Sequence, residues 1–283
     1  MSIVVSFTEV CKRLEKFFLE QAHEVHTEKW QGVDISRKPE ARMRELLHYS
    51  FSIPLRGLEA LEHWQNDIRP NLPFADVHFA ERVSGVPSNP GEAWKIWPWG
   101  NAADAHRTEG GKFTHTYQER FWPKHAGRPE PSHEGSCGPE SSCDANCMAA
   151  AYGNHGIRYP YGDLSDVVEL LRREPLTRQA YLPVWFPEDT GAVHGGRLPC
   201  SLGYHFLLRH DYLHVEYSIR SCDFVRHFRD DCYFTVRLLL WVLERLRGMD
   251  HKWGDVKPGL FKMNIGSLHM FVNDYQQLKE KHA

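Results

Sequence analysis

The 283-residue sequence has no excess of positive charge and no long apolar run. Its formal net charge is −3. Because a broad nucleic-acid-binding face needs a basic excess, we expect no polymeric nucleic acid as a partner. The longest uncharged apolar run near the C-terminus, LLLWVL at residues 238–243, is far shorter than the roughly 18 residues of a membrane span. We therefore also expect no membrane partner.

Signals for secretion and for common metal or phosphate sites are missing as well. The opening MSIVVSFTEVCKRLEKF does not show the charged, apolar and small-residue order of a signal peptide. Seven cysteines is an odd number, and a chain of this size can bury a core without disulfides. These features predict a protein of the reducing cytoplasm. Neither H-E-x-x-H nor G-x-x-x-x-G-K-[ST] occurs.

Apolar residues recur at helical spacing in four segments. A capping box at Ser6 and Glu9 starts an amphipathic helix, and a second helical pattern covers residues 55–64. Residues 163–175 predict a third helix, whose apolar stripe stops before a proline. Residues 232–246 are apolar nearly all round, which predicts a buried helix.

Two segments lack this periodicity. Residues 70–99 are rich in Pro, Gly, Asn and Trp, which predicts an aromatic loop that packs over the fold. Residues 124–149 are short of large apolar residues and predict a surface insertion in a single domain spanning residues 1–283. The insertion contains Cys137, Cys143 and Cys147. Their spacing differs from known zinc modules, so we expect free thiols and no metal, with a structural zinc site as the alternative.

Alternating residues after Cys200 predict two strands. GYHFLL and YLHVEYSIRS, separated by RHD, read as a β-hairpin, and FKMNIGSLHMFVND reads as one more strand. Arg220 then lies on the polar face of the hairpin, beside the strand of Cys200. Helices mixed with strands that look antiparallel predict one α+β domain.

Cys200 is the residue whose chemistry needs explaining. A lone buried cysteine is more often a small hydrophobe than a nucleophile, and a Cys–His hydrolase would need a positioned histidine. Arg197 is close in sequence and Arg220 is expected on the adjacent strand. Because arginine favours the thiolate, this environment favours a nucleophile over core filling.

The order of LPC, RSCDFV after 19 further residues, a long buried helix and GSLHMF resembles thymidylate synthase and the related pyrimidine-nucleotide hydroxymethylases. The resemblance covers about residues 70–274 and is strongest over residues 178–274. It implies a twisted mixed sheet packed by helices around a buried central helix. It also implies that Cys200 adds to carbon 6 of a pyrimidine nucleoside monophosphate, with methylenetetrahydrofolate as co-substrate and no metal.

The resemblance assigns roles to further residues. Glu81 and Tyr117 would move protons, with Glu45 as the alternative to Glu81. The residues implied for the nucleotide are Arg178, Arg220, Ser221, Asp231 and His269, and those implied for the folate are Trp97 and Asp223. Arg178 would reach the phosphate held by the other subunit of a homodimer.

Several positions depart from the family pattern. Gln179 stands where a second arginine is usual, Ser201 where a histidine follows the nucleophile, and Phe271 where a tyrosine binds the sugar. Arg37 is our candidate for the N-terminal phosphate arginine. The final NDYQQLKEKHA is polar, unlike the apolar tail with which thymidylate synthases exclude water. This difference, together with Ser201, favours a hydroxymethyl product over a methyl product.

The residue eleven positions after Arg220 indicates the base. Uracil enzymes of the family carry asparagine there and cytosine enzymes carry aspartate, and this chain has Asp231, preceded by Asp230. One of the two could instead cap a helix. We therefore expect folate-dependent 5-hydroxymethylation of dCMP or CMP. The alternatives are a dUMP hydroxymethylase, methyl transfer to the same nucleotide, or a relative without activity.

Overall fold

A computed structural model describes residues 6–30, 33–99, 104, 107–108, 110–124, 126, 162–190 and 197–283. The stretch with Cys137, Cys143 and Cys147 lies outside the described residues, so the loop and zinc predictions for it remain untested.

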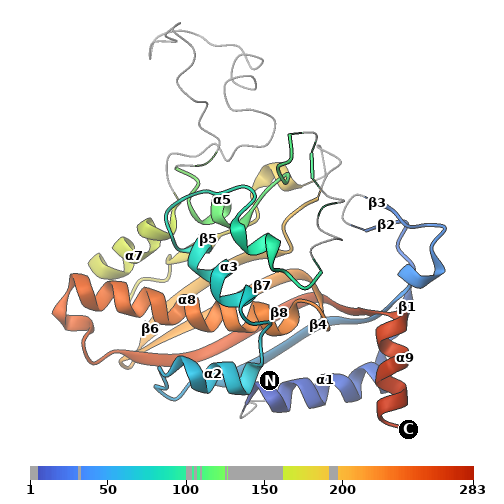
Figure 1. The fold of residues 1–283 in the computed structure, drawn as a ribbon. Helices are drawn as coiled ribbons and strands as arrows, with labels where there is room; N and C mark the ends of the chain where they lie inside the picture. Colours follow the sequence, from blue (N-terminus) through green and yellow to red (C-terminus); the bar gives the residue numbers. More distant parts are fainter. Residues whose placement is uncertain are drawn as a thin grey trace, which may run out of the picture.

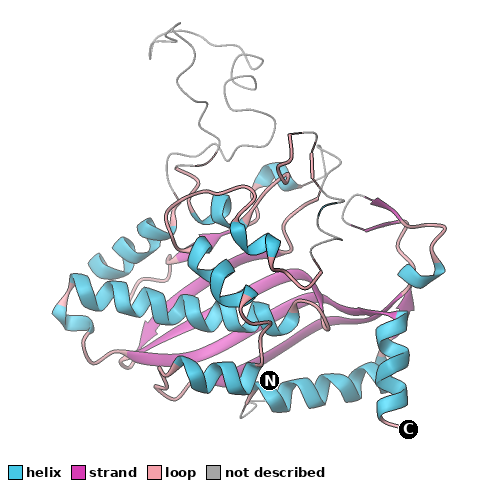
Figure 2. Ribbon diagram, in the orientation of Figure 1, coloured by secondary structure: helices cyan, strands magenta, loops and turns pink. Residues whose placement is uncertain are grey.

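The centre of the fold is a six-stranded sheet in the order β1-β4-β8-β7-β6-β5 (Figures 1 and 2). Its strands are β1 (His23–Val25), β4 (Met43–Pro54), β5 (Tyr181–Pro183), β6 (Ser201–Arg209), β7 (Tyr212–Asp223) and β8 (Lys257–Phe271). Neighbouring strands are antiparallel, except that β7 and β8 are parallel. Two short strands, β2 (Lys29–Trp30) and β3 (Val33–Asp34), form a separate ribbon. The predicted mixed sheet, hairpin and closing strand are confirmed.

Helices cover the sheet, and α1 (Phe7–Gln21) and α5 (Tyr117–Phe121) begin at local capping signals. Further helices are α2 (Leu61–Ile68), α3 (Phe74–Arg82), α7 (Leu164–Arg173), α8 (Phe228–Met249) and α9 (Val272–Lys281). Short 3-10 turns are η1 (Pro39–Ala41), η2 (Glu92–Lys95), η3 (Pro187–Asp189) and η4 (His251–Trp253). The Ser6 side chain accepts a hydrogen bond from the backbone N–H of Glu9, as the predicted cap requires.

Two sequence predictions are wrong in part. The helix predicted from the pattern of residues 55–64 forms only in its second part: β4 ends at Pro54, and α2 begins at Leu61. Residues 70–99 were expected to be a loop, yet they include helix α3. The inward face of α3 carries buried His78 and Arg82 beside its apolar residues, and these polar side chains obscure the hydrophobic period.

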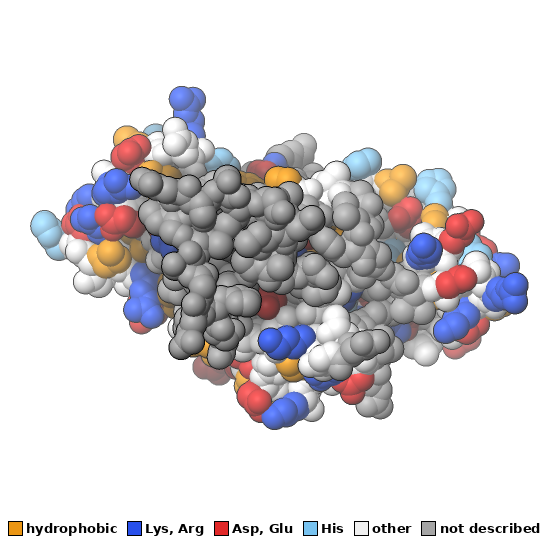
Figure 3. All heavy atoms as spheres, turned by 90° about the horizontal axis from the view of Figure 1, so that it is seen from above, with side chains coloured by type: hydrophobic (Ala, Val, Ile, Leu, Met, Phe, Trp, Pro, Cys, Tyr) orange, Lys and Arg blue, Asp and Glu red, His pale blue; other side chains and the backbone are white. Residues whose placement is uncertain are grey.

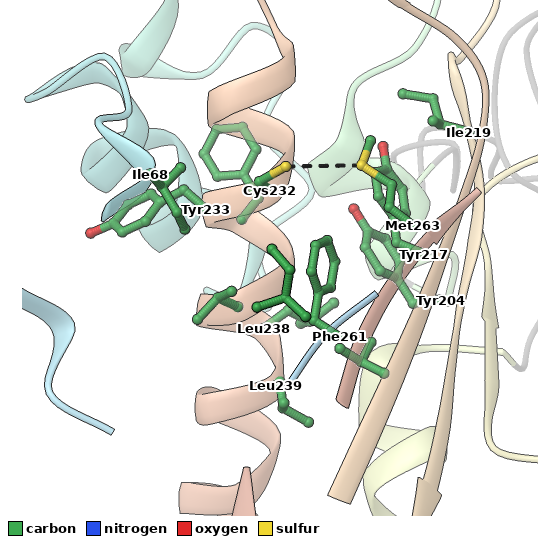
Figure 4. Close-up of a cluster of buried hydrophobic side chains, with 14 of the residues drawn as sticks. Ile68, Tyr204, Tyr217, Ile219, Cys232, Tyr233, Leu238, Leu239, Phe261 and Met263 are labelled. Carbon is green, nitrogen blue, oxygen red and sulfur yellow. Dashed lines mark hydrogen bonds between the residues drawn. The ribbon is translucent and has the colours of Figure 1, made fainter. Parts of the chain in front are cut away.

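Helix α8 packs across the sheet and forms the centre of the core, as predicted for residues 232–246. Its Leu238 and Leu239 belong to the same buried cluster as Phe261 of β8 and the ring pair Tyr204 and Tyr217 (Figure 4). Each fully buried side chain of this size contributes about 1.5–3 kcal/mol through burial. The core therefore holds α8 in a fixed position over β7 and β8.

The parallel pairing of β7 and β8 determines where polar groups collect. Both strands end at the same edge of the sheet, where Asp223 pairs in register with His269. Helix α8 begins only a few residues later, so Asp231 in its first turn lies at this edge too.

The described surface shows mixed charge. Lysine and arginine side chains intermingle with aspartate and glutamate on the face shown in Figure 3. Within the described ranges, no helix combines the length and apolarity that crossing a membrane requires.

Candidate active site

A cavity of about 240 Å³ lies at the sheet edge where β7 and β8 end. Eight of the predicted site residues line it: Tyr117, Trp97, Cys200, Arg220, Ser221, Asp223, Asp231 and His269. Two others, Glu81 and Arg178, are not among the lining residues. The structure thus brings together most of the residues that the sequence singled out. Their roles stay predictions.

Cys200 directly precedes β6, and Arg220 of β7 holds the backbone leading to it. The backbone N–H of Arg220 donates to the Cys200 carbonyl oxygen at 2.9 Å. Its guanidinium Nε donates to the carbonyl oxygen of Pro199 at 2.9 Å, and Nη2 donates to that of Leu198 at 3.3 Å. A Cβ at Gly266 of β8 would lie 2.8 Å from the Arg220 carbonyl oxygen, so the strand behind Arg220 needs a glycine.

Ser201, which stands where the family carries a histidine, faces the core. It is fully buried, and its Oγ lies 2.6 Å from the Tyr217 hydroxyl. The Ser201 side chain is not part of the cavity lining.

Asp230 and Asp231 occupy the first turn of α8 but have different partners. Asp230 accepts hydrogen bonds from the backbone N–H and the side-chain amide of Asn71, at 2.8 and 2.9 Å. Asp231 is within 3.7 Å of the Cys222 thiol, which donates to it. Burial raises the pKa of Asp231 to about 7 and that of Asp230 to about 6. Asp230 is therefore engaged by Asn71, whereas the Asp231 carboxyl is available to a ligand.

Asp223 and His269 form the floor of the cavity at the strand ends. Asp223 accepts from the backbone N–H groups of Val225 and Arg226 and pairs with the Arg226 guanidinium at 3.1 Å. His269 is in register with Glu45 of β4 on one side and Asp223 on the other. Burial lowers the pKa of His269, so its imidazole is neutral at pH 7.

Aromatic rings form another wall. Trp97 stacks on His227 with ring centres 5.5 Å apart, and it meets Trp94 edge to face. The indole N–H groups of both tryptophans are buried and have no hydrogen-bond acceptor among the described residues. Burial lowers the pKa of His227 to about 4. A flat conjugated ring with hydrogen-bond acceptors on its edge suits this wall.

Glu81 does not line the cavity and instead makes structural hydrogen bonds. Its carboxylate accepts from the backbone N–H of Ala93 at 3.0 Å and from the Gln118 amide at 2.8 Å. It therefore ties α3 to η2 and α5. Glu45, the alternative acid, does line the cavity and accepts from the Ser267 hydroxyl.

Sequence reasoning missed several lining residues. His78 and Arg82 of α3 line the cavity, as do Trp94 and His227, and so does Arg197, which the sequence had placed near Cys200. The Arg82 guanidinium stacks on the Tyr117 ring at 4.2 Å and on the Phe234 ring at 4.1 Å. The four-residue spacing of His78 and Arg82 was the available signal, but it has meaning only once α3 is known to be a helix.

Arg178 and Arg37 lie on the surface. Arg178 precedes β5 and is exposed, and Arg37 is exposed near η1. The action of Arg178 in a second subunit and the choice of Arg37 both stay predictions. Among the described residues, no three His, Cys, Asp or Glu side chains are grouped to hold a metal ion.

Comparisons with known proteins agree on one family. A family model described as thymidylate synthase matches residues 92–283, about two-thirds of the chain. A protein of Methanosarcina mazei, described as "Putative thymidylate synthase", is 26% identical over 113 residues, which are 40% of this chain and 48% of that protein. The chain thus matches about half the length of this relative. Thermostable thymidylate synthase A from Bacillus subtilis superposes with a TM-score of 0.63 at 13% identity, covering 98% of this chain and 83% of its own, which shows the fold.

Proposed function

Because the chain belongs to the thymidylate synthase family, we propose that it adds a hydroxymethyl group to carbon 5 of dCMP or CMP. The observation that carries the proposal is one cavity lined by the Cys200 thiol, the Tyr117 phenol and the Asp231 carboxyl. Asp230 is engaged by Asn71, so Asp231 is the aspartate available to contact the base. Methylenetetrahydrofolate would be the co-substrate.

Cys200 supplies the nucleophile in this proposal. Carbon 5 of a pyrimidine is a poor nucleophile, and addition of the Cys200 thiolate to carbon 6 makes it an enamine-like one. Arg220 holds the two carbonyl groups before Cys200 and so keeps the sulfur directed at the ring. Burial raises the pKa of Tyr117, which keeps its phenol protonated and able to donate a proton or hydrogen bond.

Asp231 would read the base. A carboxylate accepts a hydrogen bond from the exocyclic amine of cytosine, and a carboxyl whose pKa is about 7 can share a proton with ring nitrogen 3. A uracil nucleotide offers an N–H and a carbonyl oxygen at the same two positions, which favours an amide reader. The aspartate therefore supports cytosine over uracil.

The aromatic wall fits the folate. Trp94 and Trp97 offer ring surface and two indole N–H groups that the described residues leave without acceptors. Asp223 shapes the turn beside them through its bonds to Val225 and Arg226. When bound, methylenetetrahydrofolate supplies a one-carbon unit at the oxidation level of formaldehyde.

One sequence feature supports hydroxymethyl over methyl: Ser201 in place of the family histidine. The Ser201 hydroxyl is buried against the Tyr217 hydroxyl at 2.6 Å.

The test incubates the protein with dCMP, CMP or dUMP and methylenetetrahydrofolate and identifies products by mass. We expect a cytosine nucleotide heavier by the elements of formaldehyde, and no product from Cys200→Ser. A product heavier by one CH₂ would establish methyl transfer, and preference for dUMP would establish the uracil alternative. Absence of tritium release from carbon-5-labelled nucleotides would identify a relative without activity.

A homodimer follows as a further part of the proposal. Arg178 is exposed and lies outside the cavity lining of its own chain, as expected for a residue that acts in the other subunit. The sheet face opposite α8 carries half-buried polar residues, among them Glu216, Lys262 and Asn264, which are linked by hydrogen bonds. Such a face is better suited to packing against the sheet of a partner subunit than to exposure to solvent.

A further inference from the structure

Arg82 is a buried cation with no salt-bridge partner among the described residues, although its charge partly offsets the burial that raises the pKa values of Asp230 and Asp231. It is 3% exposed, and the rings of Tyr117 and Phe234 stack on its guanidinium at 4.2 and 4.1 Å. Its Nη2 lies 3.1 Å from Nε2 of His78, whereas Nε and Nη1 have no hydrogen-bond acceptor in the described structure. A buried charge left in this state is costly, so its retention points to a ligand atom that completes it.

The stacking rings limit what Arg82 can bind. With two rings stacked on it, only the N–H groups on the guanidinium edge remain for a ligand, and these donate to oxygen. Arg82 lines the same cavity as Cys200 and Asp231, and its stacking partner Tyr117 lines it too. The ligand atom is therefore an oxygen close to the sulfur and the base.

We propose that Arg82, positioned by His78, holds the water molecule whose oxygen becomes the hydroxyl group of the product. This inference rests on the proposed function. Water fits because it is small enough for an enclosed guanidinium, and because Asp231 is already proposed to read the base. Buried donors that lack protein acceptors are commonly satisfied by an ordered water.

The reaction step balances in atoms and electrons. The water oxygen bonds to the methylene carbon attached to carbon 5 of the pyrimidine. The double bond of that methylene shifts into the ring between carbons 5 and 6. The bond between carbon 6 and the Cys200 sulfur breaks, and the sulfur leaves as thiolate. The proton lost by the water is taken up by the Cys200 thiolate that leaves.

His78 positions Arg82 for this step. Arginine only donates, so Nε2 of His78 is the acceptor and its hydrogen is on Nδ1, which faces the Glu81 carboxylate at 3.7 Å. Burial and the adjacent Arg82 lower the pKa of His78 to about 4, which keeps the imidazole neutral at pH 7. The neutral imidazole therefore accepts from Arg82 and fixes the direction of the guanidinium.

The experiment separates the early steps from water addition. Tritium release from carbon-5-labelled dCMP reports the steps through loss of the carbon 5 proton, and mass spectrometry reports the hydroxymethyl product. In Arg82→Met, which keeps a long apolar side chain between the two rings, we expect tritium release within about threefold of wild type. The hydroxymethyl product per tritium released should fall at least about tenfold. An added small thiol should capture the accumulating methylene as a thioether.

Arg237→Met is the matched control. Arg237 also stacks on two rings, Phe79 and Tyr233, but it pairs with Asp76 and is not part of the cavity lining. In Arg237→Met, the ratio of hydroxymethyl product to released tritium should equal that of wild type. The melting temperature of the protein without ligands should not fall in Arg82→Met, because the lost group is a buried charge without a salt-bridge partner, whereas it should fall in Arg237→Met.

Three outcomes would overturn the inference. An unchanged ratio in Arg82→Met would show that Arg82 does not hold the water. Parallel loss of tritium release and product, with a raised KM for the nucleotide, would assign Arg82 to the nucleotide. A large fall in melting temperature would make Arg82 structural, and His78→Gln, which must also lower the ratio, is then the deciding variant. Absence of tritium release in wild type would instead refute the proposed function.

Discussion

Arg220 donates through Nε to the carbonyl oxygen of Pro199, the residue before Cys200, at 2.9 Å. A second bond from the same guanidinium reaches Leu198. One side chain thus fixes two consecutive peptide groups next to Cys200, and only a fork-shaped donor can do this.

Arg220→Lys should therefore impair catalysis more than folding. A single ammonium group cannot hold both carbonyl oxygens in the same way, so we expect kcat/KM to fall at least about 30-fold, with a change in melting temperature of about 2 °C or less. Arg209→Lys is the control, because Arg209 likewise donates to two backbone carbonyl groups, those of Leu176 and Leu208, away from the cavity. Equal kcat/KM values for the two variants would contradict this role for Arg220.

Stability should depend on pH through Asp231. Its pKa is raised from 3.8 to about 7 in the folded protein, so the folded state binds the proton more tightly than the unfolded state. The resulting stabilisation is complete below about pH 4 and is lost as the pH rises through 7. Asp231→Asn removes this dependence, and the free energy of unfolding should then decline less between pH 5 and 8, by at most about 4 kcal/mol.

Urea denaturation of both proteins at the two pH values measures the difference. Asp230, whose pKa is raised to about 6, stays in the variant and leaves a smaller decline of the same sign. Identical declines in wild type and Asp231→Asn would show that Asp231 does not titrate in this range.

Glu81 should couple energetically to Gly91. A Cβ at Gly91 would lie 2.2 Å from Glu81 Oε2, so Gly91→Ala must displace the carboxylate that binds the Ala93 N–H and Gln118. We expect a destabilisation of about 1–3 kcal/mol, much of it absent when Glu81→Ala is already present. Gly248→Ala is the control, because nothing lies near its added Cβ inside α8 and helix propensity predicts a gain of up to about 1 kcal/mol. Additive effects of the two changes would rule out the contact.

Complementation tests the action of Arg178 in the second subunit. Arg178→Ala and Cys200→Ser proteins should each be inactive in the homodimer, because each site lacks one group. After mixing and subunit exchange, a heterodimer contains one site with both groups, so activity should return to about a quarter of wild type. Mixtures that stay inactive despite proven exchange would show that Arg178 does not act in the other subunit, and full activity of Arg178→Ala alone would place Arg178 outside the site.

Local sequence signals predicted the elements they directly encode. The cap at Ser6, the alternation in β7 and the apolar surface of α8 are properties of neighbouring residues, and the structure confirms those elements. Helix α3 was missed, because two of its inward positions hold His78 and Arg82, whose burial depends on contacts with α5 and α8.

The cavity was predictable only through the family resemblance. Cys200, Asp223, Asp231 and His269 come from different elements, and no spacing rule places them together. The environment of Arg82 was likewise not predictable, since it depends on how the fold places Asp230 and Asp231 relative to its guanidinium. Glu81 and Arg82 are adjacent in sequence, yet Arg82 lines the cavity and Glu81 does not.

The order of strands has a consequence during synthesis. β8 lies between β4 and β7, although it is the last strand to leave the ribosome. Until β8 emerges, no hydrogen bonds link the amino-terminal strands to the hairpin of β6 and β7. Long-range strand pairings of this kind form only after the intervening chain has been made. A nascent chain stalled before residue 257 therefore has an unfinished sheet and lacks Ser267 and His269, the two β8 residues that line the cavity.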